Sequence, residues 1–219
     1  TIVAEAIDDL ADKLEARGGD VAEAVTAIVG ESYGQNKQIV FGGDNYSDEW
    51  HAEAEQRGLK NLKTTPDALP EVLAEPTVQV FEKYEVLSKR ELESRFEVWA
   101  EQYAINANIE AETTDSIART MLLPAALRYL TEINAAGAGA FAAGAVKDLV
   151  GELERALQEL HDANHQCPED GEGLEPAIYA RDNQIAAMAR VREVADRLEK
   201  VVADDLWPLP KYSEILFIK

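Results

Sequence analysis

The stretch VKDLVGELERALQEL, residues 146–160, decides the fold of this chain. Its apolar residues recur at steps of three and four, which places them along one face of an α-helix. A second segment, residues 178–206, has apolar residues at steps of three, four and seven. We expect the two segments to pair as an antiparallel helical hairpin with a shallow crossing angle. The two stripes are Val146, Leu149, Val150, Leu153, Leu157 and Leu160, and then Ile178, Ile185, Met188, Ala195, Leu198 and Val202.

Helix signals also fill the N-terminal part of the chain. Gly18-Gly19 interrupts a first helical pattern, and Asp20 with Glu23 forms a capping box that begins a second helix. Ser47 is placed to cap a short helix that runs to Arg57 and ends at Gly58. Further on, Thr65 precedes a proline and is placed to cap a helical turn.

The middle of the chain predicts two longer helices. Ser88 with Glu91 forms a capping box ahead of the first. The second, residues 110–133, is apolar over most of its circumference from Ile117 onward and is expected to be the buried centre. Pro124 lies inside it and should kink it or remove one hydrogen bond. The stripe of the first helix is Leu92, Phe96, Trp99 and Tyr103.

Two segments predict connections and one predicts a docked tail. Residues 134–145 are rich in alanine and glycine, and residues 161–175 contain Pro168 and Gly171, so we expect both to be loops. The tail from Trp207 to Phe217 is apolar and interrupted by prolines, and a tail of this kind is normally packed against a core.

One stretch resembles a β-strand. Gln38-Ile39-Val40-Phe41 is followed by Gly42-Gly43 and has a short-strand pattern. An isolated strand is not stable, so its partner lies either elsewhere in this chain or in a part of the protein outside it. The chain opens at Thr1 with its first helical pattern already under way, which predicts a fragment of a longer protein.

Charge limits the choice of partners. The chain has 219 residues, with 21 Lys plus Arg against 42 Asp plus Glu and a formal net charge of -21. Such a chain repels phosphate backbones and anionic lipid, so we expect it to bind neither nucleic acid nor membrane. No signal peptide is visible, and the single Cys167 cannot form an internal disulfide. We therefore expect a cytoplasmic protein.

Three groups of residues suggest metal or phosphate chemistry. His161, His165 and Cys167 have zinc-ligand spacing, but a fourth ligand is missing and surface histidines at a helix end are the favoured interpretation. Asp48-x-x-His51 and Asp162-x-x-His165 weakly resemble the carboxylate-x-x-His repeat of di-iron bundles without its further carboxylates. Gly42-Gly43-Asp44-Asn45 is glycine-rich but lacks the lysine of a P-loop. From its residues alone, this is a helical domain without a self-contained active site.

Ordered motifs along nearly the whole chain resemble type III glutamine synthetases. They are Asn45-Tyr46-Ser47-Asp48-Glu49-Trp50, Arg57 to Leu62, Lys63 to Pro70, Val80 to Tyr84, Leu87 to Leu92, Asn108 to Ala111, Leu123-Pro124-Ala125 and Trp207 to Tyr212. The opening Thr1 to Ala6 is similar to the segment that follows the catalytic motifs of that family.

The resemblance implies an enzyme that uses ATP to phosphorylate the side-chain carboxylate of glutamate, after which ammonia displaces phosphate to give glutamine. It also implies Mg or Mn ions and a large ring-built homo-oligomer, a dodecamer of two hexameric rings. In that family the metal carboxylates, ATP contacts and glutamate-binding arginine lie upstream of the Thr1 equivalent. No catalytic, cofactor-binding or metal residue is therefore carried over to this chain, and we expect the isolated fragment to be structural and inactive.

Together these expectations define the architecture. The fold is mainly α, a helical bundle with a long antiparallel helix hairpin and one short strand near residues 38–41 left from the catalytic α+β domain. Residues 1–44 are expected to be the trailing edge of that domain and residues 45–219 a helical C-terminal domain. The alternative is a non-enzymatic acidic helical module that binds a protein partner.

Overall fold

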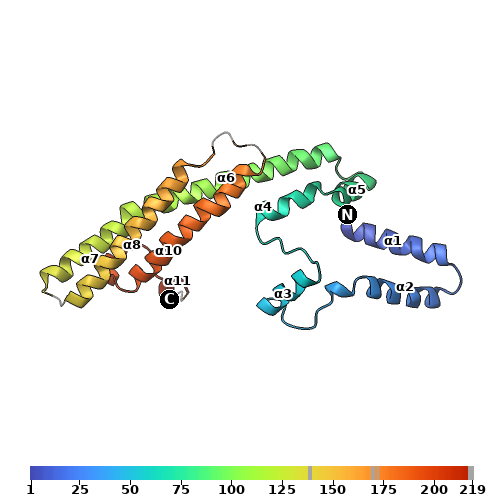
Figure 1. Cartoon of the computed structure of the whole chain (residues 1–219), viewed down its shortest axis with the longest axis horizontal. Coiled ribbons are helices and arrows are strands. Elements are labelled where there is room, and N and C mark those ends of the chain that lie inside the picture. Colours follow the sequence, from blue (N-terminus) through green and yellow to red (C-terminus); the bar gives the residue numbers. More distant parts are fainter. Residues whose placement is uncertain (138–139, 169–170, 172, 217–219) are drawn as a thin grey trace. The chain divides into compact units, whose positions relative to one another are not determined.

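The chain folds mainly into α-helices, as expected (Figure 1). The structure is a computed structural model that describes residues 1–137, 140–168, 171 and 173–216. These residues divide into two compact units, Thr1–Phe96 and Glu97–Lys219.

The core of the second unit lies between three helical segments. Helix α8 (Ala140–His165) packs against α7 (Leu123–Ala135) and against α10 (Ala186–Glu199). The whole predicted stripe of residues 146–160 is buried, and Leu153, Leu157 and Leu160 have no exposed surface. Burial of a leucine side chain stabilises the fold by about 1.5–3 kcal/mol, so this face of α8 is the main contribution to the core.

The predicted antiparallel hairpin is confirmed by pairs between α8 and α10. Arg190 Nε lies 2.5 Å from Glu159 Oε2, and further along Arg197 bonds to Glu152. From the first pair to the second, the residue number rises on α10 and falls on α8, so the two helices are antiparallel. Arg197 lowers the pKa of the Glu152 carboxyl by a direct hydrogen bond.

The buried stripe of the second hairpin segment differs from the predicted one. Ile178 and Ile185 lie on the exposed side, although Leu198 and Val202 are buried. The segment consists of α9 (Glu175–Tyr179), a π-helical turn η4 (Ala180–Ile185) and α10. The small alanine side chains of this segment allow it to approach its neighbouring helices closely. The face that carries these alanines is therefore buried, and the face that carries the larger Ile178 and Ile185 is not. The members of the buried face are Ala177, Ala180, Gln184, Ala187, Val191, Val194 and Leu198.

The two middle helices form one continuous helical rod. Helix α6 (Lys89–Ile117) passes through a π-helical turn η3 (Ala118–Leu122) directly into α7. The predicted break before residue 110 is absent because no glycine or proline lies there. Pro124 follows the π turn, as expected for a residue that has no N–H and whose ring clashes with the preceding turn.

This rod is less buried than expected. In α7, Ala125 and Ala126 are buried but Leu127 is exposed, so the helix covers the core with one face only. Of the predicted stripe on α6, Leu92 is buried and Trp99 is 41% exposed.

The connections are shorter than predicted. The alanines of residues 134–145 favour helix, so α7 continues to Ala135 and α8 begins at Ala140. Residues 138–139, and residues 169–170 and 172 of the other predicted loop, lie outside the described residues. The tail packs on the core through Leu206, Trp207 and Leu209 as predicted, then forms a short helix α11 (Tyr212–Leu216), while residues 217–219 are not described.

Three helices of the first unit begin at a side-chain cap. Asp20 accepts from the Glu23 N–H at the start of α2 (Val21–Gln35), and Ser47 accepts from Trp50 at the start of α3 (Asp48–Gln56). Both caps were predicted. The cap of α4 (Thr65–Ala68) is Thr64 rather than the predicted Thr65, because Thr64 keeps the extended backbone that a capping residue needs. A 3-10 segment, η2 (Leu69–Leu73), follows and leads to α5.

Helix α1 (Ile2–Arg17) contacts α5 (Glu75–Lys83) through charged groups. Lys83 Nζ lies 2.8 Å from Glu5 Oε2 and 2.9 Å from Asp8 Oδ2, and the Tyr84 hydroxyl donates to Asp8 at 2.9 Å. Lys83 and Tyr84 lower the pKa of both carboxyls, and partial desolvation raises the pKa of Tyr84 to about 12. The polar side of α1 therefore holds it to its own unit.

The predicted strand at residues 38–41 is wrong. Lys37–Ile39 forms a 3-10 turn, and no strand occurs among the described residues. Instead of a partner strand, the Arg57 guanidinium donates to the carbonyls of Gln38 and Val40 at 3.0 and 2.9 Å. Phe41 stacks on Trp50 with ring centroids 4.3 Å apart. These contacts replace the ladder that an isolated strand lacks.

Candidate functional site

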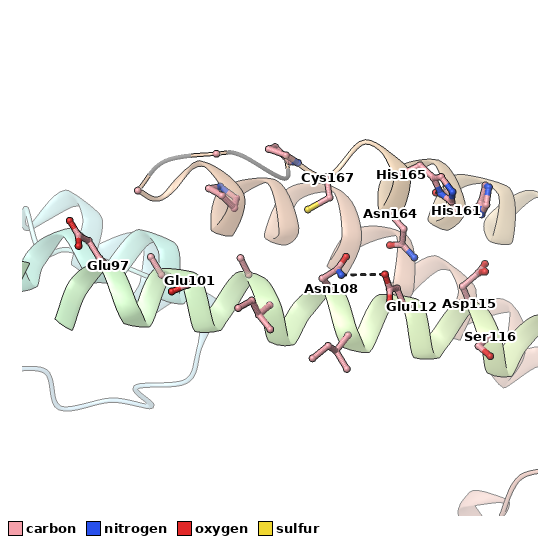
Figure 2. Close-up of a pocket in the computed structure, with 18 residues that line it drawn as sticks. Glu97, Glu101, Asn108, Glu112, Asp115, Ser116, His161, Asn164, His165 and Cys167 are labelled. Carbon is pink, nitrogen blue, oxygen red and sulfur yellow. Dashed lines mark hydrogen bonds between the residues drawn. The ribbon is translucent and has the colours of Figure 1, made fainter. Parts of the chain in front are cut away.

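The second unit contains a cleft of about 1000 Å³ between α6 and the end of α8 (Figure 2). One wall is a face of α6, where residues spaced three and four apart lie on the same side. Glu97, Glu101, Asn108, Glu112 and Asp115 form this wall, and Asn108 donates to Glu112 at 3.3 Å.

The other wall brings together the histidines and the cysteine that have zinc-ligand spacing. The rings of His161 and His165 lie 4.0 Å apart, and His165 Nδ1 is 2.9 Å from the carbonyl oxygen of His161. Cys167 follows at the cleft margin. No group of three or more His, Cys, Asp or Glu side chains suited to a metal occurs in the described parts of the chain. The His165 side chain is exposed and that of His161 is partly buried.

The two carboxylate-histidine pairs belong to different units of the chain. Asp162 accepts a hydrogen bond from Gln158 at 2.8 Å on the exposed side of α8. Asp48 and His51 lie in the first turn of α3, in the other unit. The glycine-rich segment at Gly42-Gly43 leads into Asp44, whose side chain accepts from the Tyr46 N–H at 2.9 Å.

Three side-chain amides at the cleft were not predicted from the sequence. Gln184 Nε2 donates to Asn108 Oδ1 at 2.8 Å and to Asn164 Oδ1 at 3.3 Å. Gln184 is fully buried, while both asparagines line the cleft. The signal in the sequence was a glutamine at a regular seven-residue position between Ala177 and Val191. The amides join α6, α8 and η4 at one level of the bundle.

Two further contacts fix the walls of the cleft. Arg119 bonds to Asp115 at 2.8 Å and donates to the carbonyl of Leu157 in α8 at 2.9 Å. The Tyr179 hydroxyl donates to the carbonyl of Ala163 at 2.8 Å, and its burial, with Cys167 nearby, raises the pKa of its phenol.

The cleft does not fit a nucleotide with its metal. The described residues that line it include four carboxylates and no lysine or arginine that could meet phosphate groups. No helix in the described parts of the chain is long and apolar enough to cross a membrane.

The described residues of the second unit thus form a helical bundle with a polar cleft lined by carboxylates, amides and histidines. Residues 24–139 match the model of the glutamine synthetase C-terminal domain, and this chain belongs to that family.

Full-length relatives extend the match over the rest of the chain. It is 31% identical to a type-3 glutamine synthetase of Dictyostelium discoideum, with 100% of this chain and 32% of the relative covered. It is 29% identical to a glutamine synthetase of Butyrivibrio fibrisolvens and 28% identical to one of Bacteroides fragilis, over 94% and 95% of this chain. The chain spans about a third of the length of these relatives.

Proposed function

We propose that this chain is the C-terminal part of a type III glutamine synthetase. The whole enzyme ligates ammonia to glutamate: ATP phosphorylates the γ-carboxylate, and ammonia then displaces phosphate. The observation that supports this is the match of nearly the entire chain to relatives named glutamine synthetase, one of them a type-3 enzyme. The ordered motifs between Asn45 and Tyr212 agree with it.

Within that enzyme, we propose a structural role for this chain. Residues 1–44 would complete the catalytic domain and residues 45–219 form a helical C-terminal domain. The catalytic, ATP-binding and Mg- or Mn-binding residues belong to the part of the enzyme that precedes this chain. The composition of the cleft, with carboxylates and no lysine or arginine among its described lining, supports this division.

The assembly and location follow from the family. We propose a cytoplasmic, ring-based homo-oligomer, with the dodecamer as the expected form. The strongly acidic chain, with a net charge of -21, agrees with the absence of nucleic acid or membrane partners.

The test compares the full-length protein with the isolated chain. Each is incubated with Mg, ATP, glutamate and ammonia, and glutamine and phosphate are measured. We expect turnover by the full-length protein and none by residues 1–219. Turnover by the isolated chain would contradict the structural role. A well-folded full-length protein that forms no glutamine with Mg or Mn would contradict the proposed activity.

A further inference from the structure

Helix α1 has its polar side packed and its apolar side exposed. Val3, Ile7, Leu10 and Leu14 recur at steps of four, three and four, so they share one face, which we name the α1 stripe. Val3 is 71% exposed, Ile7 63% and Leu10 39%, whereas Leu14 at the other end of the stripe is partly buried. A helix of a complete domain normally has the reverse arrangement.

The contacts of α1 explain this arrangement. Glu5 and Asp8 lie on the opposite side of the helix from the α1 stripe, and they bind Lys83 and Tyr84 of the same unit. Arg17 pairs with Glu31 of α2 at 2.6 Å. These ion pairs and hydrogen bonds leave the N-terminal half of the stripe, Val3 and Ile7, uncovered. The neighbouring helix α2 repeats the pattern with exposed valines, which are Val21, Val25 and Val29.

The family match indicates what covers the stripe. The C-terminal-domain model begins at residue 24, so all of α1 precedes it. The relatives are about three times as long as this chain, and the chain matches their C-terminal region. The part of the enzyme that joins α1 is therefore the part before residue 1.

Charge argues against a second copy of this chain as the partner. Residues 1–35 contain eight acidic side chains (Glu5, Asp8, Asp9, Asp12, Glu15, Asp20, Glu23 and Glu31) and two basic ones (Lys13 and Arg17), a formal charge of -6. Two such hairpins placed face to face would repel each other.

We propose that the α1 stripe is buried in the full-length synthetase, where it packs against the part of the enzyme that precedes residue 1. This inference rests on the proposed function, because that preceding part belongs to the synthetase. It assigns to α1 the role of joining the catalytic part to the C-terminal helices.

Cysteine labelling of residue 7 tests the proposal directly. The variant Ile7→Cys is made in the isolated chain and in the full-length protein, and alkylation of the peptide containing residue 7 is followed by mass spectrometry. We expect rapid labelling in the isolated chain and labelling slower by about tenfold or more in the full-length protein. The matched variant Ala16→Cys lies on the opposite side of α1 and should label at similar rates in both.

The possible results separate the hypotheses. Equal rates for Ile7→Cys in the two proteins would overturn the proposal, as would equal slowing of both variants. Slow labelling in the isolated chain that speeds up on dilution would identify a second copy as the partner and also overturn it. Protection of residue 7 in a full-length protein without synthetase activity would support the interface and reject the proposed function.

A charge inserted into the stripe provides a second readout. Ile7→Glu should change the Tm of the isolated chain by less than about 2 °C, since it replaces an exposed residue. In the full-length protein the same change buries a carboxylate and should lower the Tm and the yield of assembled oligomer. Ala16→Glu adds the same charge on the other side and should do neither. Similar behaviour of the two variants in the full-length protein would contradict the interface.

Discussion

At the scale of one residue, the buried Gln184 links helices of this bundle through its side-chain amide. It is the only polar side chain among the described residues that is buried. Its amide reaches Asn108 on α6 and Asn164 on α8, so a single side chain links three helical segments. Sequence patterning missed it because a glutamine between alanines looks like a surface residue. Only the packing of η4 shows that the alanines mark the buried face.

Replacement of Gln184 by alanine should destabilise the second unit. The variant Gln184→Ala loses two hydrogen bonds and leaves a cavity, which together cost about 2 kcal/mol. Urea denaturation followed by circular dichroism measures this cost. Gln158→Ala is the matched control, because Gln158 bonds to Asp162 on the exposed side of α8 and its loss should cost less than about 0.5 kcal/mol. Equal costs for the two variants would show that the amide link contributes nothing.

At the scale of helices and strands, the prediction succeeded where large apolar residues carry the period. The stripe from Val146 to Leu160 contains leucine and valine, and all of it is buried. The prediction failed where the structure depends on contacts between residues that are far apart in the sequence. The segment at 38–41 has strand-like residues but no partner, and Arg57 satisfies its carbonyls from a distance of 17 and 19 residues.

The sequence analysis of the site met the same limit. The motifs that identified the family are local and could be read in order, whereas the amides of the cleft come from three separate helices. Nothing local marks Asn108, Asn164 and Gln184 as neighbours, because 76 residues separate Asn108 from Gln184. Such contacts depend on the packing of the bundle.

The capping box of α6 offers a prediction at this scale. Ser88 Oγ accepts from the Glu91 N–H at 3.3 Å, and the Glu91 carboxylate accepts from the Ser88 N–H at 2.8 Å. Ser88→Ala should lower the free energy of unfolding by about 1 kcal/mol. Ser116→Ala, inside the same helix, should be neutral or stabilise by up to about 0.5 kcal/mol, because alanine is the better helix former.

The cost of Ser88→Ala should also depend on pH. The hydrogen bonds from Ser88 lower the pKa of Glu91. A lowered folded-state pKa stabilises the fold above the ordinary pKa of the carboxyl, and this contribution is lost as the pH falls through the lowered value. The difference between wild type and Ser88→Ala should therefore shrink between pH 7 and about pH 3. A cost that stays constant over this range would mean that the Ser88 hydroxyl does not contribute to the lowered pKa of Glu91.

At the scale of the whole chain, excess negative charge should limit stability. With 42 acidic and 21 basic side chains, half of the acidic groups have no basic counterpart even if every base is paired. Their mutual repulsion weakens as salt screens it, since the screening length falls from about 30 Å at 0.01 M to about 3 Å at 1 M. Scanning calorimetry of the isolated chain should thus show a Tm that rises by several degrees with added NaCl.

Two charge variants on the exposed side of α8 test the same physical cause. Glu154→Lys lowers the negative charge and should raise the Tm at low salt, whereas Arg155→Glu should lower it, and NaCl should reduce both differences.

Acidification should at first raise the Tm as salt does, because it neutralises carboxylates that are not in ion pairs. Below about pH 4 the sign reverses, since Glu5, Asp8, Glu152 and Asp182 have lowered pKa values and lose their ion pairs on protonation. The Tm should therefore pass through a maximum near about pH 5–6. A Tm that falls with added NaCl would mean that the ion pairs outweigh the repulsion.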